Sequence, residues 1–478
     1  MGLLPGRAQV AGARGVLTRA GWAAILVCLL AAGCSKSYET SALSTPVILI
    51  SIDTLRADSV DDTGTPNLAR FRDEALSFNG AFSEIPFTLS AHATMLTGLA
   101  PDAHGVFGAQ DRISAGQVTL AQALGAAGYR TAAVVSSDWL RPEFGFGRGF
   151  ESYDQVAEGL TFAERVTQVG VQSLDRIVGQ RGTPFMFLHY YDAHSDSELK
   201  GNRRAYYASP AASDGLAEPC AQGQCAPAEE GSEGSRCATG FLLWANRHAS
   251  EISQGQRECL RASYRAGVGD FDQAFGDLRG ELEERGLWDQ ALIVVTSDHG
   301  EEFGEHGQFI HAQPYVESLA IPLWIKLPGG RRGGEGLDRQ AQLADVMPTL
   351  LGQLGLTVDR EMTGRDLLGG GAIGERLILG QNKYRPELYS AQDVRWKLMH
   401  DFVVGRSKLY DLTSDAGETK DVAGDHPETV AALLSALERR RAQLLSLRGH
   451  RESQGLGEEG ETLTPEAVRR LEALGYVD

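Results

Sequence analysis

Residues 45–53 read TPVILISID, and this stretch sets the fold class of the chain. After Pro46 it is an almost unbroken run of aliphatic and β-branched side chains, typical of a strand buried on both faces of a sheet. Similar runs recur at residues 129–137, 184–192, 291–299 and 321–329. Stretches with helical spacing lie between them, at residues 65–76, 119–128 and 270–287. This alternation predicts an α/β domain with a mostly parallel sheet.

The sequence changes character twice after this pattern begins. Between about residues 195 and 254 it becomes rich in Gly, Ser, Ala, Pro and Cys without a sustained period, which predicts an insertion at one edge of the domain. From residue 374, short strand-like pieces precede a helical stretch at 426–447, which predicts a smaller α+β subdomain over 374–478. A last amphipathic helix is expected at 464–478. The main domain then spans 46–373.

The composition excludes one class of function. The 478 residues carry a formal charge of -18, and the sequence pI is about 5.1. The acidic residues are spread along the chain rather than gathered in one tail. A protein that wraps nucleic acid needs the opposite balance, so we expect no nucleic-acid partner.

The N-terminal segment has the pattern of an export signal over residues 1–33. Arg7, Arg14 and Arg19 precede an apolar run at 21–34 that is too short to span a bilayer comfortably. Small residues come directly before Cys34, as in a bacterial lipobox, so we expect Cys34 to carry a lipid, followed by a tether over 34–45. Plain secretory cleavage and an uncleaved anchor are the alternatives. The expected location is the cell envelope, at the outer membrane or the periplasmic face, with membrane contact through the anchor.

Four cysteines are clustered within one stretch of about forty residues, in and just after the expected insertion: Cys220, Cys225, Cys237 and Cys259. An even number in an exported segment favours two disulfides, with three pairings open. A zinc site is the alternative. The spacings of five, twelve and twenty-two residues do not match the paired C-x-x-C of zinc ribbons, so disulfides are the preferred interpretation.

Two of the predicted strands end in acidic residues. Asp53 follows the run at 47–52, and Asp298 with His299 follows the run at 291–297. Ligands of open α/β sheets bind beyond the carboxyl ends of the strands, so these side chains are candidate ligands of one or two divalent ions. Two carboxylates and an imidazole suit zinc, manganese, calcium or magnesium. Helix capping by each aspartate is the alternative.

Residues 86–98, PFTLSAHATMLTG, place hydroxyl groups where a helix is expected to start. Thr88 and Ser90 fall in the N-cap region, close to free backbone N–H groups and the positive end of the helix dipole. Such a place binds anions, and a hydroxyl there could act as a metal-activated nucleophile toward a phosphate or sulfate ester. The alternative is an ordinary capping residue.

Several blocks in a fixed order resemble the sulfatase family of the alkaline phosphatase superfamily. They are residues 47–58, 78–106, 187–196, 284–307, 321–330, 343–356 and 408–423. The resemblance implies an α/β/α sandwich with a smaller C-terminal α+β subdomain, so that 46–373 would be the catalytic domain. It also implies metal-assisted attack on a phosphate, phosphonate or sulfate ester, with an anionic ester as the substrate.

The resemblance also assigns roles. It implies that Asp53, Asp298 and His299 hold the metal together with Thr88, which falls on the nucleophile. His311 lies near the position of the basic residue that touches the transferred group, and His194 matches the histidine that reaches the substrate. We expect His194, His311 and His92 to bind or protonate the reacting groups. Asp192 and His189 are their neighbours or ligands of a second metal. Arg56 could clamp a substrate oxygen, with a surface salt bridge as the alternative.

The chain departs from sulfatases at the nucleophile. Sulfatases convert a Cys or Ser in a C/S-x-P-x-R motif to formylglycine, whereas this chain has Thr88 there and His92 in place of the arginine. Thr54 replaces the second early aspartate. A threonine resembles the phosphodiesterases and phosphoryl transferases of the superfamily, so phosphorus esters are favoured over sulfate esters. The alternative is an inactive surface lipoprotein that keeps the fold as a binding module.

Overall fold

The computed structural model describes residues 45–156, 162–178, 182–195, 225–226, 236–237, 239–358, 361–369 and 376–453. The expected export signal, Cys34 with its lipid, Cys220 and the helix expected at 464–478 lie outside these residues. Within the described part of the chain, no helix is long and apolar enough to cross a membrane.

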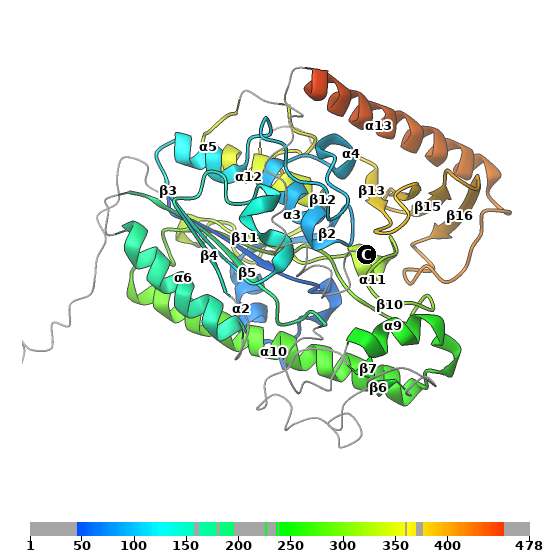
Figure 1. Ribbon diagram of the computed structural model, residues 1–478, viewed down its shortest axis with the longest axis horizontal. Helices are drawn as coiled ribbons and strands as arrows, with labels where there is room; N and C mark the ends of the chain where they lie inside the picture. The colour runs from blue at the N-terminus through cyan, green and yellow to red at the C-terminus, as the bar shows by residue number, and fades with distance from the viewer. Residues whose placement is uncertain are drawn as a thin grey trace, which may run out of the picture.

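A mixed eight-stranded sheet forms the centre of the molecule (Figure 1). Its strand order is β12-β2-β11-β8-β1-β5-β3-β4. β11 is antiparallel to both of its neighbours, and the other pairs are parallel. In chain order the strands are β1 (Val47–Ile52), β2 (Leu76–Phe82), β3 (Arg130–Val135), β4 (Ser152–Gln155), β5 (Pro184–Tyr190), β8 (Leu292–Ser297), β11 (Leu323–Lys326) and β12 (Gly336–Gln342).

Helices cover both faces of this sheet. One face carries α3 (Thr88–Thr97), α5 (Leu120–Ala126) and α12 (Val346–Gln353); the other carries α2 (Pro66–Glu74), α6 (Phe162–Val178) and α10 (Gln254–Glu284) (Figure 1). β1 supplies both cores, because Val47 and Leu49 join one apolar cluster while Ile48 and Ile50 join the other. The α/β/α sandwich with a mostly parallel sheet is confirmed.

All five strands expected from apolar runs are present, but β2, β4 and β12 were missed. β4 has four residues, and none of them is buried. Residues 65–76 were expected to be helical throughout, whereas α2 ends at Glu74 and β2 begins at Leu76. β2 alternates between buried and partly exposed positions, and β12 (GLDRQAQ) lies at the edge of the sheet with several exposed polar side chains. Neither strand needs the continuous apolar run by which a doubly buried strand is recognised.

The expected insertion is more ordered at its end than its composition indicated. Helix α9 (Thr239–Arg247) places Phe241, Leu242 and Ala245 in the apolar cluster under the sheet. The two-residue strands β6 (Cys225–Ala226) and β7 (Arg236–Cys237) pair with Cys225 opposite Cys237. Cys259, on α10, is disulfide-bonded. The pairing of the four cysteines stays a prediction.

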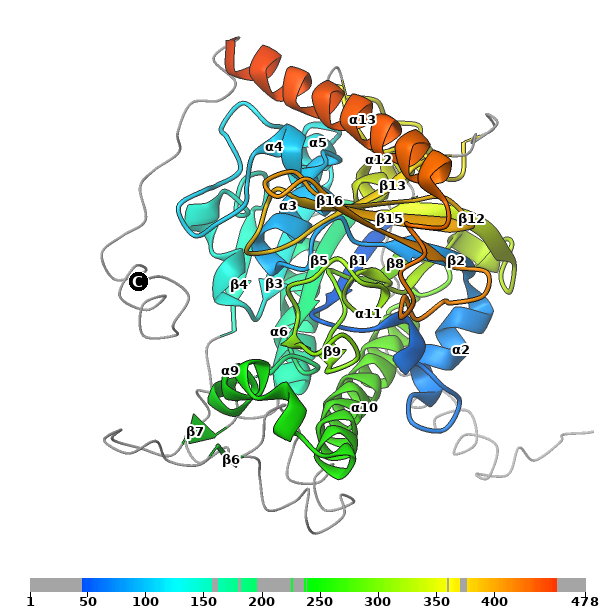
Figure 2. The same cartoon turned by 90° about the vertical axis from the view of Figure 1, so that its right-hand side faces the viewer.

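A separate four-stranded antiparallel sheet follows in the C-terminal part of the chain. Its strands, in both chain and spatial order, are β13 (Ile378–Gln381), β14 (Leu388–Gln392), β15 (Trp396–Asp401) and β16 (Arg406–Asp411). The long helix α13 (Pro427–Ser453) runs over this sheet and reaches the short helix α4 (Pro101–His104) of the main domain (Figure 2). The separate C-terminal sheet and its helix agree with the expected fold class.

Short elements lie between β8 and β11, on the side of the sheet edge where the parallel strands end. They are β9 (Glu302–Phe303), β10 (Phe309–Ile310) and α11 (Val316–Leu319). Backbone hydrogen bonds from Gly300 to Ser318 and from Glu301 to Glu317 join the two ends of the segment, and the Ser83 N–H donates to the Leu319 carbonyl oxygen. The segment therefore holds its histidines close to the end of β8.

Leu437 of α13 is fully buried in an apolar cluster that includes Leu99 and Ala103 of the main domain and Leu398 of the C-terminal sheet. We expect Leu437→Ala to lower the free energy of unfolding by about 2–5 kcal/mol, because it removes buried methyl groups and leaves a cavity. Urea unfolding followed by circular dichroism measures this change. Leu445→Ala is the matched control, because Leu445 is 40% exposed on the same helix. Equal effects of the two variants would mean that α13 does not pack on the main domain in this way.

Candidate functional site

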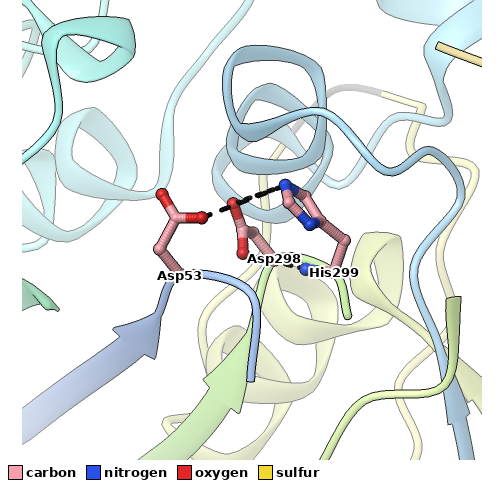
Figure 3. Close-up of side chains that lie close together, drawn as sticks. All are labelled: Asp53, Asp298 and His299. Carbon is pink, nitrogen blue, oxygen red and sulfur yellow. Dashed lines mark hydrogen bonds and ion pairs between the residues drawn. The ribbon is translucent and has the colours of Figure 1, made fainter. Parts of the chain in front are cut away.

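The site begins at the ends of two neighbouring parallel strands. β1 and β8 pair in register, so that Ile52 lies opposite Ser297. Asp53 and Asp298 are the next residues of the two strands, and Figure 3 shows their carboxylates and the His299 ring directed toward one another. One ligand atom from each of the three residues lies within 4.8 Å of the other two, and all three residues are buried. The structure thus brings together the three side chains expected to hold the metal.

The hydrogen bonds of His299 fix which ring nitrogen is available. Its Nδ1 lies 3.0 Å from the carbonyl oxygen of Gly300, which can only accept, so Nδ1 carries the proton. Nε2 is then a bare lone pair, 3.4 Å from Asp298 Oδ2 and 4.0 Å from Asp53 Oδ1 (Figure 3). This is how metal-binding histidines are usually oriented, with the second nitrogen held by a carbonyl.

The three atoms that could bind a metal have no hydrogen-bond partner among the described residues. Asp53 Oδ1, Asp298 Oδ2 and His299 Nε2 are buried and make no hydrogen bond within the described structure. Burial raises the pKa of Asp53 to about 8, and burial together with the charge of Asp53 raises the pKa of Asp298 to about 7. Orphaned buried acceptors around one point are costly unless a cation satisfies them. The residues present therefore fit a divalent metal ion.

Thr54 holds the second carboxylate in place at a strained position. Its φ of 58° lies in the left-handed region, which a β-branched residue rarely adopts. In this conformation its backbone N–H donates to Asp298 Oδ1 at 3.1 Å, and its carbonyl oxygen accepts from the Tyr264 hydroxyl at 2.8 Å. Thr54 thus contributes its backbone at the position of the missing second aspartate.

Thr88 starts helix α3 directly beside the first carboxylate. Phe87 is the N-cap and Thr88 the first helical residue, so the hydroxyl does not cap the helix. Instead Oγ1 donates to Asp53 Oδ2 at 3.4 Å, and the residue is 2% exposed. As the first residue of α3, Thr88 belongs to the helical turn whose N–H groups have no partner within the helix. Ser90 points elsewhere, because its hydroxyl donates to the carbonyl oxygen of Val106 at 2.7 Å.

His92 lies behind Thr88 and is fully hydrogen-bonded. Its Nδ1 donates to the Thr88 carbonyl oxygen at 2.8 Å, and its Nε2 accepts from the Ser51 hydroxyl of β1 at 2.9 Å. With both nitrogens engaged and no exposed surface, the ring connects the start of α3 to the central strand. This geometry positions Thr88 rather than presenting a free imidazole to a substrate.

Three further histidines surround the candidate metal position. His189, the last residue but one of β5, has its Nε2 3.5 Å from Asp53 Oδ2, and this nitrogen has no hydrogen-bond partner within the described structure. The His311 ring lies 4.2 Å from the His299 ring and 5.2 Å from the His194 ring, measured between centroids. Burial lowers the pKa of His194 to about 3 and that of His311 well below its usual value. Both imidazoles are therefore neutral at pH 7.

Lys383 is a site residue that sequence reasoning missed. It follows β13 of the C-terminal sheet, and its backbone N–H donates to the carbonyl oxygen of Ala312, next to His311, at 2.9 Å. Its Nζ lies 5.0 Å from the ring centre of Phe87, next to Thr88. Its positive charge lowers the pKa values of Asp53, His194, His299 and His311. No spacing in the sequence connects Lys383 with these residues, because it belongs to a different sheet.

Two expected substrate-binding residues have other partners. The Arg56 guanidinium is held by Asp58 at 2.7 Å, by Glu305 at 2.9 Å and by the carbonyl oxygen of Glu301 at 3.0 Å. Asp192 Oδ1 accepts from the backbone N–H of Ala163 in the first turn of α6, at 3.0 Å. Arg56 thus takes part in a network of ion pairs, the alternative left open by its sequence, and Asp192 supports a helix start.

The buried hydrogen bonds of His92 make a testable prediction. His92→Ala would leave the Ser51 hydroxyl and the Thr88 carbonyl without partners, so we expect the free energy of unfolding to fall by about 2–5 kcal/mol. Urea unfolding measures the change. His426→Ala, at an exposed position, is the control and should cost no more than about 1 kcal/mol. Wild-type stability of His92→Ala would contradict the positioning role.

Comparison with known proteins identifies the family. The sulfatase family model matches residues 45–356, more than half of the 478 residues. The multifunctional alkaline phosphatase superfamily protein PehA of Trinickia caryophylli is 34% identical over 156 residues, which is 32% of this chain and 29% of that protein. An arylsulfatase of Clostridium perfringens is 22% identical over 382 residues, covering 67% of this chain and 77% of that one.

Solved structures share the fold. A phosphonate monoester hydrolase of Agrobacterium radiobacter superposes with a TM-score of 0.65 at 21% identity, covering 84% of this chain and 96% of that one. A 2-O glycosaminoglycan sulfatase gives a TM-score of 0.65 at 16% identity, with 84% and 92% covered. The aligned part of PehA is less than a third of that protein, so its name alone carries no activity to this chain. The match of the family model over the whole central sheet shows that the chain belongs to the sulfatase family.

Proposed function

We propose that this protein is a metal-dependent hydrolase or transferase of phosphate, phosphonate or sulfate esters that uses Thr88 as its nucleophile. One observation carries the proposal: the Thr88 hydroxyl lies 3.4 Å from Asp53 Oδ2, beside the orphaned ligand atoms of Asp53, Asp298 and His299. A bound divalent ion would lower the pKa of a nearby hydroxyl and polarise the ester oxygen.

The reaction consists of two displacements at one atom. Thr88 Oγ1 gives up its proton and forms a bond to the phosphorus or sulfur atom, while the bond to the leaving oxygen breaks and the alcohol departs. A water molecule, or an acceptor alcohol in a transferase, then attacks the same atom and frees Thr88. The N–H groups at the start of α3 lie where an oxyanion of the transferred group would be held.

The surrounding side chains have complementary roles in this proposal. His194 Nδ1 donates to the carbonyl oxygen of Ser195 at 2.5 Å, and His311 Nδ1 lies 3.2 Å from a carboxylate oxygen of Glu301. Their Nε2 atoms are therefore bare and can accept hydrogen bonds from the attacking or leaving oxygen's O–H group. Lys383 supplies a positive charge that favours the anionic group during transfer.

Phosphorus esters are the preferred substrates in this proposal. Threonine cannot become formylglycine, and a sulfated threonine is a stable ester that releases sulfate less readily than a formylglycine hemiacetal does. The structural neighbour named as a phosphonate monoester hydrolase and the relative named as a multifunctional protein of the alkaline phosphatase superfamily add support. Sulfate esters are also tested, because two similar proteins are named as an arylsulfatase and a glycosaminoglycan sulfatase.

We expect Thr88→Ala to lower kcat by about a thousandfold or more while the bound metal remains, because Asp53, Asp298 and His299 are unchanged. Chromogenic phosphomonoesters, phosphodiesters, phosphonates and sulfates are assayed with zinc, manganese and calcium, and metal content is measured by plasma mass spectrometry. Thr88→Ser is the matched control, because it keeps the hydroxyl.

Each result of this panel is informative. Full turnover by Thr88→Ala would remove Thr88 from the mechanism, and turnover of sulfate esters alone would contradict the preference for phosphorus. If wild-type protein with bound metal turns over none of the esters, the binding-module alternative becomes the better interpretation.

Lys383 gives an independent test. We expect Lys383→Ala to lower kcat/KM by about a hundredfold, because one cation that stabilises the transferred oxyanion is lost. Lys383→Arg should recover part of the loss. Lys420→Ala, an exposed lysine elsewhere in the same subdomain, should leave kcat/KM unchanged. A wild-type value for Lys383→Ala would show that the C-terminal subdomain contributes no charge to the reaction.

Location in the cell envelope belongs to the same proposal. Export and lipid attachment at Cys34 rest on the sequence pattern of residues 1–34. An exported enzyme of this chemistry would meet anionic esters of the envelope or of the surroundings.

A further inference from the structure

A cavity of about 310 Å³ lies between the main domain and helix α13. Glu84 and Gln342, which follow β2 and end β12, contribute to its wall on one side. Arg440, Gln443 and Leu444 of α13 line the other side. β12 is three strands away from β8 in the sheet, and neighbouring strands are about 4.8 Å apart. The cavity is therefore on the order of 14 Å along the sheet edge from the strand that carries Asp298.

Three arginines from separate segments line this cavity: Arg365, Arg376 and Arg440. The charges of Arg365 and Arg376, together with burial, lower the pKa of Arg440. The positive charges of these arginines repel one another. The protein as a whole carries a formal charge of -18, so the charge of this cavity is opposite in sign to that of the whole chain. The cavity is a local concentration of positive charge in an acidic protein.

The nearby acids do not balance these arginines. Asp345 accepts two hydrogen bonds from Arg376 and is fully buried, so it neutralises one guanidinium. Burial and the charge of Asp345 raise the pKa of Glu84 to about 8, so Glu84 is largely protonated at pH 7. Exposed Glu361 offsets part of the charge on Arg440. Among the residues that the structure describes here, Arg376 is neutralised by Asp345, and Arg440 has only the exposed Glu361 as an attractive charge.

Polar atoms at the cavity have unused hydrogen-bonding capacity. Glu84 is 3% exposed, and its Oε2 has no hydrogen-bond partner, while Oε1 accepts from the backbone N–H of Ala344 at 3.2 Å. Arg376 Nε is likewise buried without a partner. The hydrogen bond found for Arg440 within the described structure runs to the carbonyl oxygen of Thr363 and is long, at 3.4 Å. A protonated carboxyl and two guanidinium groups are thus available as donors toward one space.

We propose that this cavity is an anion-binding site, separate from the metal cluster, for a phosphate, sulfate or carboxylate group held by Arg376, Arg440 and Glu84. Guanidinium groups match these oxyanions in geometry and charge. Leu377, Leu379 and Leu444 make part of the wall apolar, so the anion can carry a small organic body. The anion is either a free ion or a second charged group of a larger ester. The proposal does not depend on turnover at Thr88.

Tungstate is the probe for the position of the site, because it is a tetrahedral oxyanion with strong anomalous scattering. Crystals of the metal-loaded wild-type protein are soaked with tungstate, and we expect an anomalous peak between Arg376 and Arg440, whether or not a second peak occurs near Thr88. No peak in the cavity at tungstate concentrations that saturate binding in solution would overturn the proposal.

Phosphate binding in solution tests the residues. We expect Arg440→Gln to weaken calorimetric binding of inorganic phosphate to the cavity about tenfold or more. Arg439→Gln is the matched control, because Arg439 is the exposed neighbour on α13 and removes the same charge. Any binding near Thr88 is common to both variants and to the wild type, so the difference reports the cavity. Equal binding by the two variants would contradict the proposal.

Two additions guard against misfolding and separate the two sources of the anion. Arg440→Lys keeps the charge and should keep most of the binding, and the melting temperature of each variant is compared with that of the wild type. If the anion belongs to the substrate, Arg440→Gln raises KM for esters with two anionic groups but not for esters with one. If it is a free ion, KM changes for neither, and only the phosphate titration differs.

Discussion

Two buried carboxylates, Asp53 and Asp298, at the ends of adjacent parallel strands constrain the rest of this structure. Neither has exposed surface, and each raises the free energy of the other's charged form. Such a pair is tolerated when a cation lies between the oxygens, which is why the orphaned acceptors and the bare Nε2 of His299 point to one position. The continuous apolar sequence of β1 and β8 is what makes the pair possible, because only a rigid, fully paired sheet holds two strand ends at fixed spacing.

The nucleophile candidate is located by its connection to the same strand. His92 is hydrogen-bonded to the Thr88 carbonyl oxygen and to the Ser51 hydroxyl, so it links the first turn of α3 directly to β1. The strained backbone of Thr54 does the equivalent work for Asp298. His92 and the Thr54 backbone therefore set the positions of Thr88 and Asp298. Their hydrogen bonds are buried from water, which limits the variation of those positions.

The C-terminal subdomain brings a lysine close to the candidate site in addition to covering the sheet. Gln381 of β13 donates to the Glu84 carbonyl oxygen, and two residues later Lys383 reaches the histidine cluster. Glu84 in turn belongs to the arginine-lined cavity under α13. The segment from Glu84 to Thr88 thus runs from that cavity to the metal cluster, so an anion held at one end and a reacting ester at the other would share a short stretch of backbone.

The sequence by itself determined the fold class and the candidate metal ligands of this protein. A strand buried on both faces requires an unbroken apolar run, and the residue after such a strand falls at the edge where parallel strands end, so TPVILISID and ALIVVTSDH already placed Asp53, Asp298 and His299 together. Thr88 was placed by the local pattern of a helix start. Only the tertiary structure decided the roles of Lys383, His92 and Arg56 and revealed the arginine-lined cavity. Their partners lie on other segments of the chain, and no local period encodes which sheets and helices come to face each other.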